Sequence, residues 1–299
     1  MFITRVVGQK WFTQMTAILT PLLPLGLVLL MFVVGLRLSL PRVAMAFLHP
    51  KALGTGLVVQ MILLPATAFM LARFFMLSEP MTIGLVLVAA APGGVTSNYI
   101  AHLANADVAL SAAMTLVTTT LSAFTIPLVL VLAGLADLPS ISGLARISIM
   151  MIGVALVPMA VGMVFATWQP DWAKRVTRIL DPLSKLVFAA VVLATFVQNW
   201  QPMTAHFSSV GPAVIGLNLA ALALAGGAAM LLDLGPERRR AIMVEASLQN
   251  VAVAMFVAST LLQNPALAIP ALIYALVMNV SALAQISLAH RANLSTAGA

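Results

Sequence analysis

Residues 83–98 read IGLVLVAAAPGGVTSN, an apolar run that a Pro-Gly-Gly triplet at 92–94 interrupts. Glu79 and Asp107 bracket an interval with no other Asp, Glu, Lys or Arg, long enough for one membrane crossing of about 20 residues. The interruption comes twelve residues after Pro80, close to mid-membrane at helical rise. Proline removes a backbone donor, and glycine makes unwinding cheap. The stretch therefore predicts a membrane helix that is broken near its midpoint.

The remaining chain has the composition of a membrane protein. Of its 299 residues, 62% are hydrophobic and 8% are charged, whereas soluble domains have about 25% charged residues. A membrane β-barrel would show alternating segments of about ten residues, but the apolar runs here are continuous. We therefore expect an all-α polytopic membrane protein with nine transmembrane helices.

The nine helices are counted from the intervals between charged residues. These intervals are Lys10–Arg37, Lys51–Arg73, Glu79–Asp107, Asp107–Asp137, Arg146–Asp171, Lys185–Asp233 and Glu245–Arg291. The last two are about twice as long as the others, and turn signals at 198–206 and 263–265 divide each into two helices. The first apolar stretch is longer than a signal-peptide core and is expected to remain as a helix. The charged stretch 171–185 is expected to be a loop or a short interfacial segment.

Basic residues are distributed unevenly over the expected loops. Eleven of the 15 Lys and Arg residues follow helices one, three, five and seven or lie in the C-terminal tail. Under the positive-inside rule this pattern predicts an outward N-terminus and a cytoplasmic C-terminus in a plasma membrane. The net charge of +7 thus indicates topology rather than nucleic-acid binding, with contact to anionic lipid headgroups as a secondary role.

Polar side chains occur at membrane depth in several helices. Ser97 and Asn98 directly follow the break, which favours a functional site over a simple proline kink. Ser111 and Thr115 are four residues apart and share a helix face. Membrane helices also use such residues as packing contacts or to bond their own backbone, and for this pair both interpretations stay open. For the threonine-rich run 118–122 the packing interpretation suffices.

Glu245 is the only acidic residue expected well inside a membrane helix, which makes it a candidate functional group. Pairing with Arg240, five residues earlier, is the structural alternative. Gln249 and Asn250 extend the polar character deeper than an arginine reaches. Gln60 and Asn279 are weaker signals of the same kind.

Together these positions supply neutral oxygens and one carboxylate, the ligands that a hard cation such as sodium prefers. The chain has no cysteine, which excludes disulfides and cysteine metal sites. It also has no Walker-type phosphate loop, which argues against direct use of ATP. A Ser97/His102 dyad for an intramembrane hydrolase is an alternative that no G-x-S-x-G motif supports.

The chain resembles the bile acid:sodium symporter family, which includes bacterial relatives and the mammalian bile acid transporters. The resemblance covers nearly the whole chain. It rests on Pro92-Gly93-Gly94-x-x-Ser97-Asn98, Asp107-Val108-Ala109-Leu110-Ser111 leading to Thr115, Glu245-x-x-x-Gln249-Asn250, and Gln60 with Pro65-Ala66-Thr67-Ala68. We therefore expect a transporter and not an enzyme.

The resemblance implies a fold of inverted repeats in a single membrane unit, residues 1–299. A core at about 52–134 and 208–290 would contain two broken, crossing helices. A panel would comprise helices at about 11–36, 147–167 and 183–199. The second break is implied only by the resemblance, because Ser247 and Ala252 stand where relatives often have glycine.

The resemblance also implies two sodium sites. One would use Ser97, Asn98, Ser111, Thr115 and Glu245, and the other Gln60, Glu245, Gln249 and the carbonyls of Ala246 and Leu248. Asn250 and Asn279 would face the substrate. Met278 and Val95 depart from the family pattern, which puts the substrate's identity in doubt.

The implied function is sodium-coupled symport of an amphipathic organic anion, bile acid-like or a small carboxylate, by alternating access. A proton-coupled or exchange carrier on the same fold is the first alternative. The intramembrane hydrolase and a non-transporting receptor are the others. Nothing in the chain predicts its oligomeric state.

Overall fold

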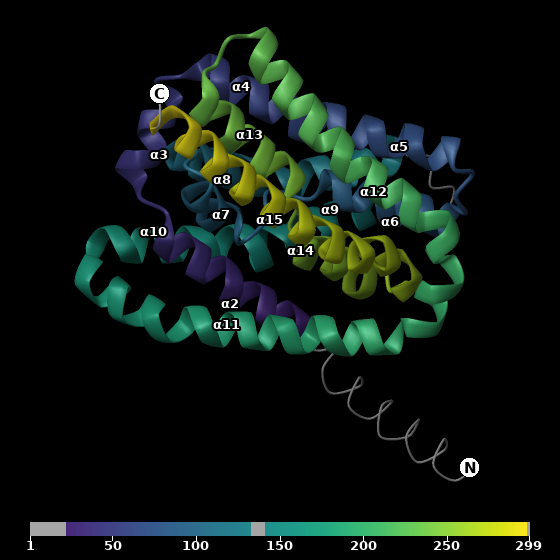
Figure 1. The fold of residues 1–299 in the computed structure, drawn as a ribbon. Helices are drawn as coiled ribbons and strands as arrows, with labels where there is room; N and C mark the ends of the chain where they lie inside the picture. Colours follow the sequence, from purple (N-terminus) through teal and green to yellow (C-terminus); the bar gives the residue numbers. More distant parts are fainter. Residues whose placement is uncertain (1–21, 133–140, 298–299) are drawn as a thin grey trace, which may run out of the picture.

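The computed structural model describes residues 22–132 and 141–297, and every regular element in these ranges is a helix (Figure 1). The α-helices are α2 (Leu22–Arg37), α3 (Leu40–Phe47), α4 (Pro50–Val58), α5 (Leu64–Phe74), α6 (Glu79–Ala90), α7 (Ser97–Leu103), α8 (Val108–Leu132), α9 (Ile141–Met151), α10 (Val157–Trp168), α11 (Pro170–Gln198), α12 (Trp200–Leu231), α13 (Pro236–Ser247), α14 (Val251–Phe256) and α15 (Ile269–Ala297). Three π-helical segments, η1 (Val59–Leu63), η2 (Ile152–Leu156) and η3 (Val257–Leu261), and the 3-10 turn η4 (Pro265–Ala268) continue them. The all-helical prediction is confirmed over these ranges.

Within the described ranges, six helices are long and apolar enough to cross a membrane. They are Pro50–Phe74, Val108–Leu132, Ser142–Trp168, Pro170–Val197, Trp200–Leu231 and Pro265–Arg291. Three shorter apolar helices accompany them, Leu23–Arg37, Glu79–Ala90 and Val251–Leu261. The chain is therefore a multi-pass α-helical membrane protein.

Two of the π-helical segments end shortly before a proline. The segment η1 ends two residues before Pro65, and η2 ends two residues before Pro158. A proline ring clashes with the carbonyl four residues earlier, and a wider helical turn relieves that clash. Both helices thus continue past their proline, and η1 carries Gln60.

Helices α2, α10 and α11 lie together along one side of the molecule, where α2 packs against both of the others (Figure 1). Glycines permit the contact between α2 and α10. A Cβ added to Gly35 would overlap the backbone of Met159, and one added to Gly162 would overlap that of Phe32. Small residues let membrane helices approach closely. Helix α11 is the most exposed of the six long spans, with only 11% of its apolar window buried in the protein.

Of the two expectations for 171–185, the loop is wrong, because α11 is helical from Pro170 onward, and the interfacial segment stays a prediction. Charged residues in this stretch pair along one helix face. Lys174 contacts Asp171 at 3.3 Å and Lys185 contacts Asp181 at 2.9 Å, the spacings that stabilise helices. The expected turn at 198–206 is also shorter than predicted. It is reduced to Asn199, and Pro202 lies in the first turn of α12, where proline is tolerated.

Two helices are interrupted in the interior of the protein. The first interruption separates α6 from α7 and was predicted; the second separates α13 from α14. The two unwound segments pair with each other as an isolated antiparallel bridge between Gly93 and Gln249. Gly94 donates its N–H to the carbonyl of Leu248 at 2.6 Å, and Asn250 donates to that of Pro92 at 2.9 Å. Backbone groups freed by each break are thus satisfied by the other.

Candidate functional site

Glu245 lies beside the crossing and is completely buried. Three hydroxyl groups donate hydrogen bonds to its Oε1 atom. They come from Ser97 at 2.6 Å, Ser111 at 2.5 Å and Thr115 at 2.9 Å. Helices α7, α8 and α13 therefore meet at one carboxylate oxygen. The structure brings together four of the five residues expected at the first sodium site.

Both interpretations of Ser111 and Thr115 find contacts in the structure, since Thr115 also lies 3.1 Å from the carbonyl of Ser111 in its own helix. Both side chains are buried and both point at Glu245. In the following run, Thr118, Thr120 and Ser122 each donate to a carbonyl of their own helix, as the packing interpretation predicts. Thr118 in addition accepts the N–H of Gly93 at the first break.

The other carboxylate oxygen of Glu245 has no hydrogen-bond partner in the described part of the chain. It points at Gly93, since a Cβ added there would overlap Oε2. An unpaired buried oxygen of a carboxylate is costly. The structural alternative for Glu245, a pair with Arg240, is wrong. Arg240 instead donates to the carbonyl of Asn105.

All buried side-chain atoms without a partner in the described ranges belong to residues that the family resemblance places at the sodium sites. They are Oε1 and Nε2 of Gln60, Oδ1 of Asn98, Oε2 of Glu245 and Oε1 of Gln249. Buried polar atoms are paired in most proteins, and exceptions call for an explanation such as a bound ion or water. Four of these five atoms are oxygens, the ligand type of an alkali cation.

The residues of the expected second site lie in contacting elements. Gln60 is 1% exposed in η1, which packs against α13, and Gln249 is fully buried at the second break. The two carbonyls assigned to this site already accept hydrogen bonds. Ala246 accepts from Nε2 of Gln249 at 2.7 Å, and Leu248 accepts from Gly94. A carbonyl oxygen has two lone pairs, so each retains capacity for a cation.

The two asparagines expected to face the substrate differ in position. Asn250 is buried at the crossing, and its Oδ1 caps α14 by accepting from Val253 N–H. Asn279 is exposed on α15 and donates to the carbonyl of Ala275 in its own helix. The structure therefore does not bring Asn279 to the buried crossing.

A network that the sequence analysis missed holds the second break. Asn218 of α12 donates to the carbonyl of Ser247 at 2.9 Å and to the hydroxyl of Tyr274 at 3.2 Å. Tyr274 of α15 donates to the same carbonyl at 2.9 Å, and Gln285 donates to the hydroxyl of Ser247. Asn218 was detectable as a lone amide in an apolar run, but its partners lie far away in the sequence.

The hydrolase alternative finds no support in the described contacts. The Ser97 hydroxyl donates to Glu245 at 2.6 Å, and its oxygen also lies 2.8 Å from the carbonyl of Gly94. His102 is exposed near the end of α7, with no hydrogen bond to Ser97 in the described ranges. The serine hydroxyl is thus directed at a carboxylate and not at an imidazole.

Comparisons with known proteins indicate the family of the chain. The family model described as "Sodium Bile acid symporter family" matches residues 24–205. A rice protein (Oryza sativa subsp. japonica), "Probable sodium/metabolite cotransporter BASS2, chloroplastic", is 28% identical over 266 residues, which cover 89% of this chain and 63% of that protein. The rice BASS1 protein is 26% identical, over 82% of this chain and 60% of its own length. The "Uncharacterized sodium-dependent transporter YocS" of Bacillus subtilis (strain 168) is 27% identical, over 85% of this chain and 78% of its own.

The chain thus spans less than two thirds of the length of the two rice relatives. The family model, in contrast, covers more than half of this chain, from α2 to the start of α12. The chain belongs to the sodium bile acid symporter family.

Proposed function

We propose that this protein is a sodium-coupled symporter of an amphipathic organic anion, either bile acid-like or a small carboxylate. The observation that carries the proposal is the buried Glu245 carboxylate, which accepts three hydroxyl donors on one oxygen and has no partner on the other. Its relatives named as sodium/metabolite cotransporters support the same class.

Two sodium ions are the proposed coupling ions. The first would lie against Glu245, with oxygens of Ser97, Asn98, Ser111 and Thr115. The second would use Gln60, Gln249 and the carbonyls of Ala246 and Leu248, with Glu245 shared. The unpaired oxygens of Gln60, Asn98, Glu245 and Gln249 support these assignments, because a cation would satisfy them.

The proposed architecture has nine crossings in an inverted-repeat fold. The six long spans supply six crossings, and the three shorter apolar helices supply three more when α6 is joined by α7 and α14 by α13. Helices α2, α10 and α11 would belong to the panel, and the crossing helices to the core. The outward N-terminus, the cytoplasmic C-terminus and a plasma-membrane location remain proposals from the distribution of basic residues.

In the proposed mechanism, sodium at Glu245 orders the crossing so that the anion meets a preformed surface beside Asn250. Movement of core against panel would then alternate access. Inward sodium movement can contribute about 2.3 kcal/mol per net charge per 100 mV of membrane potential. Asn279 would contact the substrate only in a conformation in which its face of α15 lies beside the substrate at the crossing.

A proton-coupled carrier is the main alternative. Coupling to protons would place a proton on Glu245, and the remaining oxygen, Oε2, has no hydrogen-bond partner among the described residues. Three hydroxyl donors on Oε1 favour an ionised carboxylate, which only accepts hydrogen bonds. Both observations favour sodium.

The proposal is tested by measuring thermal unfolding of the purified protein in NaCl and in KCl at equal ionic strength. Sodium should raise the unfolding temperature of the wild type, because a ligand that binds the native state stabilises it. Glu245→Gln should abolish this sodium-specific shift. Glu237→Gln is the matched control, since Glu237 is exposed on the same helix.

Uptake into proteoliposomes completes the test, with a labelled bile acid and labelled pantoate as probes. Uptake driven by a sodium gradient and lost in Glu245→Gln would support symport. Uptake driven equally by a pH gradient without sodium would overturn it in favour of the proton-coupled carrier.

A further inference from the structure

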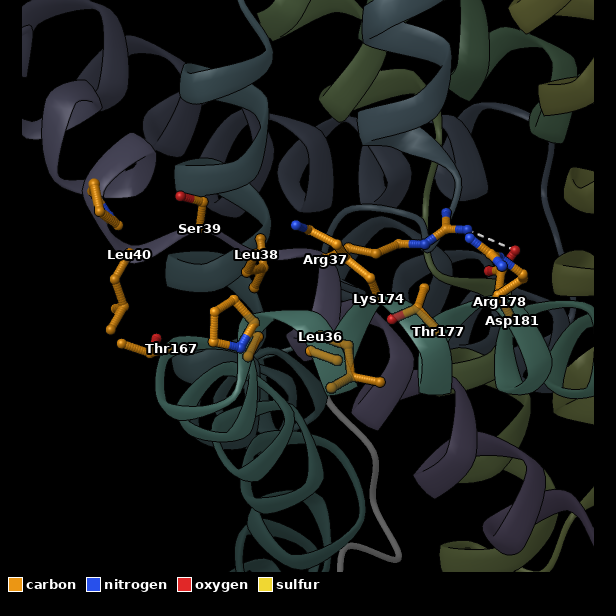
Figure 2. Close-up of a pocket in the computed structure, with 14 residues that line it drawn as sticks. Leu36, Arg37, Leu38, Ser39, Leu40, Thr167, Lys174, Thr177, Arg178 and Asp181 are labelled. Atoms are coloured by element: carbon orange, nitrogen blue, oxygen red, sulfur yellow. Dashed lines mark ion pairs between the residues drawn. The ribbon is translucent and has the colours of Figure 1, made fainter.

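A cavity of about 700 Å³ opens away from the crossing, between the end of α2, the start of α3 and the joint of α10 with α11 (Figure 2). Its lining is divided by chemistry. Arg37, Lys174 and Arg178 line it together with Asp181, and Leu36, Leu38 and Leu40 contribute apolar surface. In Figure 2, Leu40 and Thr167 lie at one end of the group and Arg178 and Asp181 at the other.

The charges that line this cavity do not cancel. Asp181 already accepts from Arg37 at 2.6 Å and from Lys185 at 2.9 Å. Lys174 contacts Asp171 at 3.3 Å, but both side chains are more than three-quarters exposed, and such pairs are weak. Arg178 has no ion-pair partner within the described ranges. Lys174 and Arg178 therefore present cationic groups that can bind an anion.

Two tryptophans indicate the depth of the cavity in the membrane. Trp168 is 83% exposed at the end of α10, and Trp172 is 58% exposed at the start of α11. Exposed tryptophan is typical of the boundary between hydrocarbon and headgroups. The cavity between these helices thus lies at headgroup level, on the side predicted to face the cytoplasm.

We propose that this cavity binds the phosphate of an anionic phospholipid headgroup through Lys174 and Arg178. Basic pockets between membrane helices at this level are suited to such headgroups, and a guanidinium group matches a phosphate with paired N–H donors. The apolar part of the lining, in which Leu40 and Pro41 are exposed, would cover the glycerol and the first acyl carbons. A free phosphate shares the charge but would leave this surface uncovered, so the lipid is the better occupant.

The bound lipid would connect two parts of the protein. Lys174 and Arg178 belong to α11, whereas Leu38 lies in the short connection after α2 and Leu40 begins α3, which packs on α8. A headgroup held between them would restrain this connection. The inference is independent of which ion drives transport, because no residue of the proposed sodium sites lines the cavity.

The test is native mass spectrometry of the detergent-purified full chain with dioctanoyl phosphatidylglycerol, dioctanoyl phosphatidylcholine or sodium phosphate. One phosphatidylglycerol should bind to the wild type at least about tenfold more tightly than phosphatidylcholine. The K174Q/R178Q variant should bind it about tenfold or more weakly, given about 1 kcal/mol for each cation near a membrane surface. R175Q should bind like the wild type, since Arg175 is on the same helix but lies over the Trp172 ring and does not line the cavity.

Three outcomes would overturn the proposal. They are equal binding of the two lipids, an equal loss in R175Q, and binding of phosphate through the same residues without binding of the lipid. Unfolding temperatures without lipid check that the double variant is folded. If it is not, K174Q and R178Q alone should each give a partial loss, and wild-type binding by both would equally overturn the assignment.

Discussion

The two interrupted helices are broken in different ways. The first break consists of Ala91–Thr96, with a proline and two glycines, and the second consists of Leu248–Asn250, with neither residue type. Backbone strain does not explain the difference. Ala91, Leu248 and Asn250 all have negative φ angles that any residue adopts.

Space at the crossing explains the glycines better than backbone freedom does. A Cβ on Gly94 would come within 2.9 Å of the carbonyl of Leu248, and a Cβ on Gly93 would overlap Glu245. The first break therefore supplies room, which the Glu245 side chain of α13 and the backbone carbonyl of Leu248 occupy. The second break is stabilised by Asn218 of α12 and Tyr274 of α15, which both donate to the carbonyl of Ser247. One break is encoded locally and the other by tertiary contacts.

The largest expected effect is that of Gly93→Ala. The added Cβ would displace the Glu245 carboxylate, and overpacking of this kind costs roughly 1–3 kcal/mol. We expect a lower unfolding temperature and loss of the sodium-specific shift in NaCl against KCl. Gly54→Ala is the control, since nothing lies within 4 Å of its added Cβ. If Gly93→Ala kept the wild-type unfolding temperature and the sodium-specific shift, glycine would not be needed for space at the first break, and the contrast between the two breaks would fail.

Ser111→Ala should have an intermediate effect. It removes one of three donors to a buried carboxylate, and hydrogen bonds to charged groups contribute about 1.5–3 kcal/mol. The sodium-specific rise in unfolding temperature should shrink without disappearing. Ser122→Ala, which removes a donor to its own helix, should leave that rise unchanged. Equal losses in the two variants would mean that hydroxyl groups on α8 contribute only to packing.

The smallest expected effect comes from removing one side-chain hydrogen bond at each break and comparing the two losses of stability. Asn218→Leu removes a donor to Ser247 at the second break and should cost about 1 kcal/mol, because Tyr274 still donates there. Thr118→Val removes the α8 side chain that accepts the Gly93 N–H at the first break, over a longer distance of 3.3 Å. It should cost less than Asn218→Leu in thermal unfolding. The opposite order would show that the first break also depends on tertiary contacts.

Much of the fold could be predicted from the sequence because membrane helices are encoded by local composition. Apolar intervals and the Pro-Gly-Gly triplet indicated the helices and the first break. The loop expected as one alternative for 171–185 was wrong, because charge alone does not reveal that these residues pair along a helix and with Arg37 of α2. The turn at 198–206 was overestimated for a similar reason, since a proline in a first turn does not end a helix.

The candidate site was predictable in its members but not in its geometry. Glu245, Ser97, Ser111 and Thr115 were singled out as polar residues at membrane depth, and they meet at one oxygen. Asn218 and Tyr274 were not found, because their role depends on the packing of α12 and α15 against the second break. Asn279 resembled a site residue by its position alone and lies on an exposed face.

The exposed helix α11 has a consequence for the lipid environment of the protein. Its 29 residues extend about 43 Å at 1.5 Å per residue, whereas the hydrocarbon layer is about 30 Å thick. A helix longer than this layer tilts, or extends into the headgroups. The charged half of α11, with Asp171 and Lys185 near its ends, is suited to extend outward, and the apolar half to remain in hydrocarbon. Bilayer thickness should therefore change the tilt of this helix before it disturbs the buried crossing.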